Sequence, residues 1–172
     1  MRSRKKQKKM SITEKKYKKL ALQVSLTGLS FCCFDTLNKK ILSYNEVHFD
    51  TFHKATKIEE LFADAFSDFP ELKDTYDEIV VIHNNTLSTF VPTALFDENY
   101  LGSYLQYNTK VFETDFFAYD TIANYEMNTV YIPYVNINNF FIDQFGSFDY
   151  KHANSILVTK ILEASKNNDT KK

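Results

Sequence analysis

The chain has 172 residues, 44% of them hydrophobic and 16% aromatic, so it can bury a sizeable core and is too apolar to be disordered throughout. Its three glycines exclude the glycine-rich loops that cradle phosphates in P-loop and dinucleotide-binding proteins. The net charge of −1 conceals a segregation: residues 1–19 carry ten Lys or Arg and one Glu, whereas residues 20–172 carry eleven basic and 21 acidic residues. The body should therefore repel phosphate-rich partners.

Alternating apolar and polar residues predict that the chain opens with three antiparallel strands. The strands are expected at residues 20–27, 29–35 and 40–49, with a tight turn at Thr27 and Gly28. A helix capped by Thr56 should follow over residues 58–66, because its apolar residues fall on one face before Pro70. This helix can cover the antiparallel meander.

The remainder continues to alternate strands and helices. Strands are predicted at residues 78–83, 88–91, 110–117, 129–133 and 148–151, and helices at 97–106, 137–144 and 154–164. The fold class is α+β, with helices packed on a mixed sheet. We expect a basic disordered arm over residues 1–17, one lobe over 18–165 and a polar tail over 166–172.

The compartment is inferred from the cysteines and the apolar segments. Cys32 and Cys33 would point to opposite faces of a strand, so we expect no disulfide and a reducing, cytoplasmic location. Residues 20–34 are apolar and follow a basic stretch, but polar residues at period two indicate a strand rather than a signal peptide. No apolar run approaches the ~20 residues of a membrane span.

The basic arm is a candidate contact for nucleic acid or an anionic membrane. Its residues are Arg2, Arg4, Lys5, Lys6, Lys8 and Lys9. The arm offers charge for phosphates, but no interleaved aromatic residues on which bases could stack. A disordered solubilising tail is the alternative interpretation.

No catalytic or metal site is predicted. His48, Asp50 and His53 are close in sequence, but a strand would place His53 on the face opposite the other two. His83 ends an apolar strand, where a structural role is expected. Four further carboxylates are interpreted as solvent-facing: Asp115, Asp120, Asp143 and Asp149.

Three segments resemble a bacterial family of unknown function whose members look like the actin-like ATPase, or ribonuclease-H-like, fold. These segments are residues 20–31, 86–92 and 128–133. The resemblance implies that the chain matches only the first of two lobes. It also places the first phosphate-binding turn at Ser25, Thr27 and Gly28, with Ser25 where the family of ATPases carries a metal-binding Asp. A ribonuclease-H-like nuclease is disfavoured as well, because the first strand has no carboxylate for its metal ions.

The expected function is therefore a non-catalytic interaction module, a degenerate actin-like lobe that binds a protein partner or itself. One alternative is an ATP-binding protein, with ATP and magnesium held only if a second lobe closes over Thr27 and Gly28. Another is an RNA-associated protein that uses its basic arm.

Overall fold

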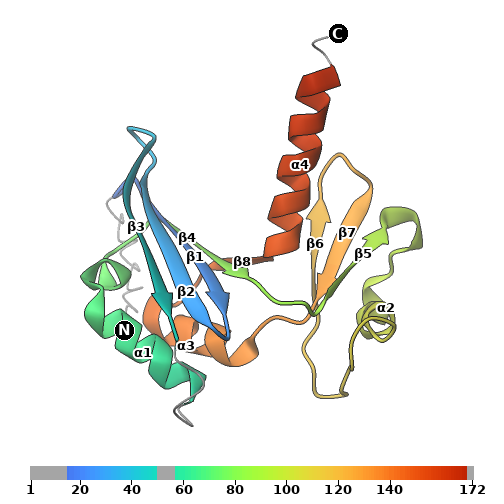
Figure 1. Ribbon diagram of the computed structural model, residues 1–172, viewed down its shortest axis with the longest axis horizontal. Helices are drawn as coiled ribbons and strands as arrows, with labels where there is room; N and C mark the ends of the chain where they lie inside the picture. The colour runs from blue at the N-terminus through green and yellow to red at the C-terminus, as the bar shows by residue number, and fades with distance from the viewer. Residues whose placement is uncertain (1–14, 50–56, 170–172) are drawn as a thin grey trace, which may run out of the picture.

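The computed structural model describes residues 15–49 and 57–169 of the chain. Within them the strands form two sheets, which Figure 1 shows on either side of the long helix α4. The first sheet has five strands in the order β3-β2-β1-β4-β8, and the second has three in the order β5-β7-β6. The α+β class with a mixed sheet is thereby confirmed.

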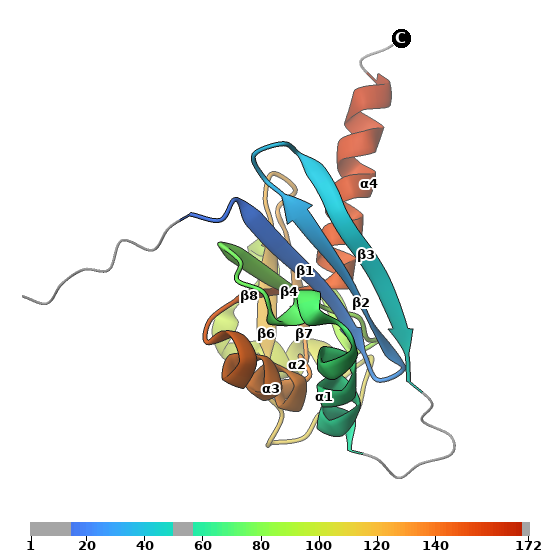
Figure 2. The ribbon, with the colours of Figure 1, turned by 90° about the vertical axis from the view of Figure 1, so that its left-hand side faces the viewer.

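The five-stranded sheet begins with the predicted meander. Strands β1 (Lys18–Ser25), β2 (Gly28–Asp35) and β3 (Lys40–His48) pair antiparallel, and β4 (Glu78–His83) and β8 (Asp149–His152) then add in parallel beyond β1. Figure 2 shows the five strands side by side in this order. Both crossovers to a parallel strand carry a helix, α1 (Ile58–Asp68) before β4 and α3 (Val135–Phe145) before β8. Right-handed crossovers that move in one direction place both helices on the same face.

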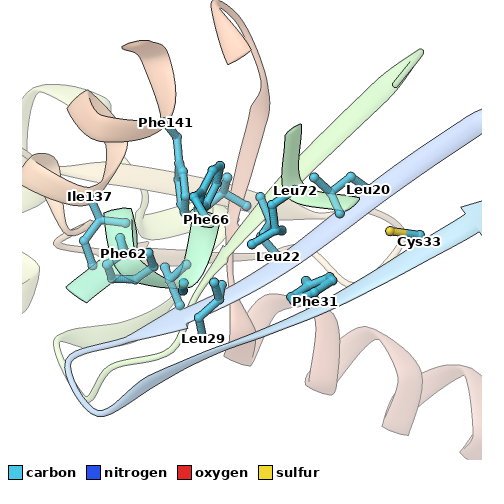
Figure 3. Close-up of a cluster of buried hydrophobic side chains, with 13 residues drawn as sticks. Leu20, Leu22, Leu29, Phe31, Cys33, Phe62, Phe66, Leu72, Ile137 and Phe141 are labelled. Atoms are coloured by element: carbon cyan, nitrogen blue, oxygen red, sulfur yellow. The ribbon is translucent and has the colours of Figure 1, made fainter. Parts of the chain in front are cut away.

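That face holds the main core, which is rich in phenylalanine. Leu20, Leu22 and Val24 alternate along β1 and point toward α1 and α3. Phe62 and Phe141 from the two helices meet edge to face, with ring centroids 5.6 Å apart. Figure 3 shows these side chains gathered on one side of the strands.

The second sheet is formed by the part of the chain between β4 and α3. It consists of β5 (Ser88–Pro92), β6 (Ala118–Ile122) and β7 (Met127–Tyr131), all paired antiparallel. Short helical turns lie between β5 and β6: η2 (Thr93–Leu95), η3 (Glu98–Tyr100) and α2 (Leu101–Leu105). Their apolar residues and one face of this sheet form a separate small core around Leu105 and Val130.

The prediction of a strand over residues 110–117 was wrong. Strand β6 begins only at Ala118, because an Asp115 carboxylate oxygen accepts the amide of Phe112 at 2.8 Å and closes a local turn. The final helix also runs past its predicted end, since α4 spans Ala153–Asp169 and includes most of the expected polar tail. Thr56, the predicted cap of α1, lies outside the described residues, and the division into arm, lobe and tail stays a prediction.

Candidate functional site

The structure brings the three predicted nucleotide-binding residues together at the turn after β1. The Ser25 and Thr27 hydroxyl oxygens are 3.1 Å apart, and the Thr27 amide donates to the Ser25 oxygen at 3.2 Å. The Ser25 hydroxyl also lies 3.2 Å from the Gly28 carbonyl oxygen, to which it can donate. These polar groups therefore satisfy one another within the turn, and a role in binding phosphate stays a prediction.

The cavity beside this turn is small for a nucleotide and contains an acidic residue. Its volume is about 160 Å³, and Glu46, His48 and Asn84 line it together with the turn. Drug-sized ligands usually occupy roughly 300 to 1,000 Å³. The Glu46 carboxylate, which lies 3.6 Å from the His48 ring nitrogen, would oppose a phosphate group. Sequence reasoning missed Glu46 and Asn84, because only strand pairing places them beside the turn.

Gly28 is explained by packing between strands. A side-chain carbon built on Gly28 would lie 2.5 Å from the carbonyl oxygen of Val47 in β3, which is a backbone atom that cannot move away alone. We expect Gly28→Ala to lower the free energy of unfolding by about 1–3 kcal/mol through this overpacking.

Urea denaturation measures this loss of stability. Gly146→Ala is unsuitable as a control, because the φ of Gly146 is +81°. Gly102→Ala is the better control, since its added carbon would lie 3.1 Å from a side-chain atom, in the ring of Phe117, rather than against backbone. An unchanged midpoint for Gly28→Ala would contradict the packing explanation.

The predicted basic residues from Arg2 to Lys9 lie outside the described residues. The two lysines at the start of β1 are paired with carboxylates within the fold. The Lys18 ammonium pairs with Asp74 at 2.5 Å, and that of Lys19 pairs with Glu78 at the same distance. The Lys16 and Lys18 amides donate to the two carboxylate oxygens of Asp77. These acceptors hold the first residues of the fold against the turn before β4.

A buried polar cluster that the sequence did not predict lies where the two sheets meet. His83 ends β4 and His152 ends the neighbouring strand β8, and both are completely buried. The amide of Tyr134 donates to Nδ1 of His83 at 3.3 Å, so the ring proton sits on Nε2, which donates to Asn138 at 3.0 Å. His83 thus fills the structural role expected for it.

His152 is held in the same protonation form. Its Nδ1 accepts the Asn154 amide at 3.1 Å, and its Nε2 lies 3.3 Å from the side-chain oxygen of Asn85. Burial lowers the pKa of His83 to about 4, and it also lowers the pKa of His152. Both rings are neutral at pH 7 with their two nitrogens engaged, so neither is free to act as a general base.

Asp120 joins the second sheet to the first and was wrongly interpreted as a solvent-facing residue. One carboxylate oxygen accepts the His152 amide at 2.8 Å and the Ser155 hydroxyl at 2.6 Å. The other accepts the Tyr131 hydroxyl at 3.2 Å. The proximity of Asp120 adds to burial in raising the pKa of Tyr131. This carboxylate also sits at the N-terminus of α4, where a negative charge is favourable.

Substituting Asp120 should weaken the contact of β6 with the end of β8 and the start of α4. Asp120→Asn removes the charge and presents an amide donor toward groups that donate, so we expect the free energy of unfolding to fall by about 2 kcal/mol. Asp143→Asn is the matched control, because Asp143 is exposed on α3. Thermal unfolding compares the two variants, and equal melting temperatures would show that Asp120 does not stabilise this contact.

Neither a metal-binding cluster nor a membrane-spanning helix is present within residues 15–49 and 57–169. No three His, Cys, Asp or Glu residues there are grouped to hold a metal ion. Asp50 and His53, two of the three weak metal candidates, fall outside this part of the chain. The helices found in it are too short or too polar to span a bilayer.

The chain belongs to the family described as "Protein of unknown function (DUF3822)", which it matches over residues 7–172. Its fold is similar to a crystal structure at 1.85 Å resolution from Bacteroides thetaiotaomicron VPI-5482, described as a protein with an actin-like ATPase fold and unknown function. The TM-score is 0.76 at 17% sequence identity, over 88% of this chain and 58% of that chain. A second similar structure is the cytoplasmic domain of EpsL, an inner membrane component of the type II secretion system of Vibrio cholerae.

The EpsL likeness has a TM-score of 0.46 at 14% identity, over 78% of this chain and 55% of that chain. No curated protein matches the chain. The resemblance expected from the sequence is confirmed by the family and by the Bacteroides structure: the fold is actin-like, and the chain spans about three-fifths of that structure.

Proposed function

We propose that this chain is a non-catalytic interaction lobe, and that the open face of its five-stranded sheet binds a second lobe of the same fold. The observation that carries the proposal is the contrast between the two faces of the sheet. The face toward α1 and α3 is covered and contains the main core. The face opposite holds apolar side chains that remain partly exposed, which we call the open face: Ala21, Cys32, Phe34, Tyr44, Val80 and Ile82.

Strand registers place these residues together. Ala21 of β1 lies opposite Cys32 of β2, which lies opposite Tyr44 of β3. On the other side Ala21 pairs with Val80 of β4. Tyr44 lies on the edge strand β3 and is 62% exposed.

Helix α4 does not close this face. Its most extensive packing contacts are with β6, β7 and β8, and Figure 1 shows it standing away from β1, β2 and β3. Two apolar residues one turn apart on α4, Leu157 and Ile161, are 57% and 56% exposed. They add to the exposed apolar surface of the chain. Contiguous apolar surface of this kind is typical of interaction sites.

A second lobe is the occupant that the fold favours. The Bacteroides protein with an actin-like ATPase fold is longer than the part that matches this chain, which covers 58% of it. Actin-like proteins place two lobes against each other, and the family resemblance assigns this chain to the first. The second lobe can be contributed by this protein or by a partner, and the apolar chemistry of the open face is the same in either case.

The proposal is tested by binding of an environment-sensitive apolar dye to the purified protein, with sedimentation velocity to record its state of association. The wild type should bind dye, and Ile82→Glu should lose most of that signal while keeping its far-ultraviolet circular dichroism. Leu95→Glu is the control, because Leu95 is 71% exposed away from the open face. A protein that sediments as a monomer and binds no dye would overturn the proposal.

A chemical readout on the same face uses the two free cysteines. Cys32 is partly exposed, whereas Cys33 is buried in the core with its sulfur 3.0 Å from the Tyr76 hydroxyl. Burial raises the pKa of the Cys32 thiol, so a maleimide should label it more slowly than a free cysteine and should spare Cys33. Occupation of the open face is then seen as protection of Cys32.

A further inference from the structure

A groove at the junction of the two sheets is distinct from the open face and from the turn after β1. Its volume is about 480 Å³, within the range of small-molecule sites. It runs along the edge strand β6, which has a partner strand on one side only among the described residues. Residues of η3, β7 and β8 complete its walls.

Four aromatic residues line this groove together with polar ones. Phe117, Tyr119, Tyr131 and Tyr150 all line it. Each ring packs on a residue outside this set, as Tyr119 does on Phe96 with centroids 4.7 Å apart. Within the described residues no close ring pair is formed between any two of the four, so they do not fill the groove by stacking on each other. Tyr131 is only 1% exposed, whereas Tyr119 is 40% exposed and is the most accessible of the four rings. An accessible aromatic ring attracts cations.

Two carboxylates add negative charge to the same groove, and none of its lining residues is basic. Asp120 lines the groove, and its carboxylate accepts three hydrogen bonds. All three donors are neutral groups, so none of them neutralises its charge. Glu98 accepts the Tyr119 hydroxyl at 3.2 Å from the opposite wall. An anion would be repelled here, and a neutral ligand would leave the two charges without a partner.

We propose that this groove binds an alkylammonium group, with the cation against the ring of Tyr119 and between Glu98 and Asp120. The same chemistry is presented by a free small molecule with a quaternary ammonium and by a lysine side chain of a partner protein. This inference does not depend on the proposed function of the open face.

The test is calorimetric or NMR titration of the purified protein with choline and, separately, with the peptide Gly-Gly-Lys-Gly-Gly. The neutral isostere 3,3-dimethylbutanol has the shape of choline without its charge. We expect millimolar binding of at least one cationic probe and at least tenfold weaker binding of the isostere. Tighter binding of choline would identify a small molecule as the source of the ammonium, and tighter binding of the peptide would identify a protein side chain.

Two exposed positions allow the site to be probed without disturbing the contacts of Asp120 with His152 and Ser155. Tyr119→Leu and Glu98→Gln should each weaken the cationic probe at least threefold, since both residues line the groove. Tyr107→Leu is the matched control, because Tyr107 is 86% exposed and does not line the groove. Equal affinity for choline and its isostere, no binding of either cationic probe, or unchanged affinity in Tyr119→Leu would overturn the proposal.

Discussion

Replacing Phe141 by alanine is expected to lower the free energy of unfolding by about 3–5 kcal/mol. Phe141 is completely buried on α3. Its ring lies within 6.1 Å of the ring centroids of five other phenylalanines: Phe62, Phe66, Phe140, Phe145 and Phe148. Truncation would remove all of these contacts and leave a cavity between α1, α3 and the sheet.

Urea denaturation followed by circular dichroism measures this loss. Phe112→Ala is the control, because Phe112 is 52% exposed and should change stability by less than about 1 kcal/mol. If Phe141→Ala does not fold, Phe141→Leu retains most of the volume and should show a smaller loss in the same direction. A loss for Phe141→Ala no larger than that for Phe112→Ala would show that the phenylalanine cluster does not hold the helices on the sheet.

The second large effect is a loss of stability in mild acid. The pKa of His83 in the folded protein is about 4, below its ordinary value of 6.5, because burial penalises the charged ring. Between these two values the unfolded chain binds a proton that the folded chain does not, so stability falls as the pH falls. The contribution is fully present above pH 6.5, and roughly 3 kcal/mol is lost by pH 4. His152 adds to this loss in the same direction, since burial lowers its pKa as well.

Both histidine rings pack against other ionisable groups. His83 faces Tyr134, Tyr150 of β8 and the His152 ring, and His152 faces Asp120 and Tyr131 of the second sheet. Asp35, Asp74 and Asp77 have lowered pKa values because of hydrogen bonds, so their stabilisation is lost only at a pH below the ordinary value of 3.8. The interval from pH 6.5 to 4 therefore reports mainly on the buried histidines.

Denaturation midpoints across this interval test the histidine effect. His83→Gln should flatten the pH dependence, whereas His48→Gln should retain the wild-type profile because the His48 side chain is 81% exposed. A wild-type midpoint that does not change between pH 6.5 and 4 would contradict the burial of neutral histidines where the two sheets meet.

The sequence predicted the first half of the fold better than the second. Strict alternation at Leu20, Leu22 and Val24 identified β1, because a strand with one buried face has a period of two. The region between β5 and β7 lacks such a period. Its aromatic residues serve a small separate core through short helical turns, and the Asp115 turn delays β6 beyond the predicted strand.

The candidate sites could be predicted only where their residues are neighbours in sequence. Ser25, Thr27 and Gly28 lie in one turn, and the structure keeps them together. Asp120 and His152 are brought into contact by the pairing of β4 with β8 and by the return of the chain through β6. Nothing local to either residue indicates that contact, since an Asp between Tyr119 and Thr121 and a His between Lys151 and Ala153 would equally suit a solvent-facing position.

The most direct test of a non-catalytic interaction lobe is calorimetric titration of the purified protein with magnesium and ATP. The proposal predicts no measurable heat, because Ser25 and Thr27 satisfy each other in the turn and the adjoining cavity of about 160 Å³ contains Glu46. Micromolar binding that is lost in Thr27→Ala would contradict it. Such binding would show that the first phosphate turn still functions, and that the chain is a nucleotide-binding lobe.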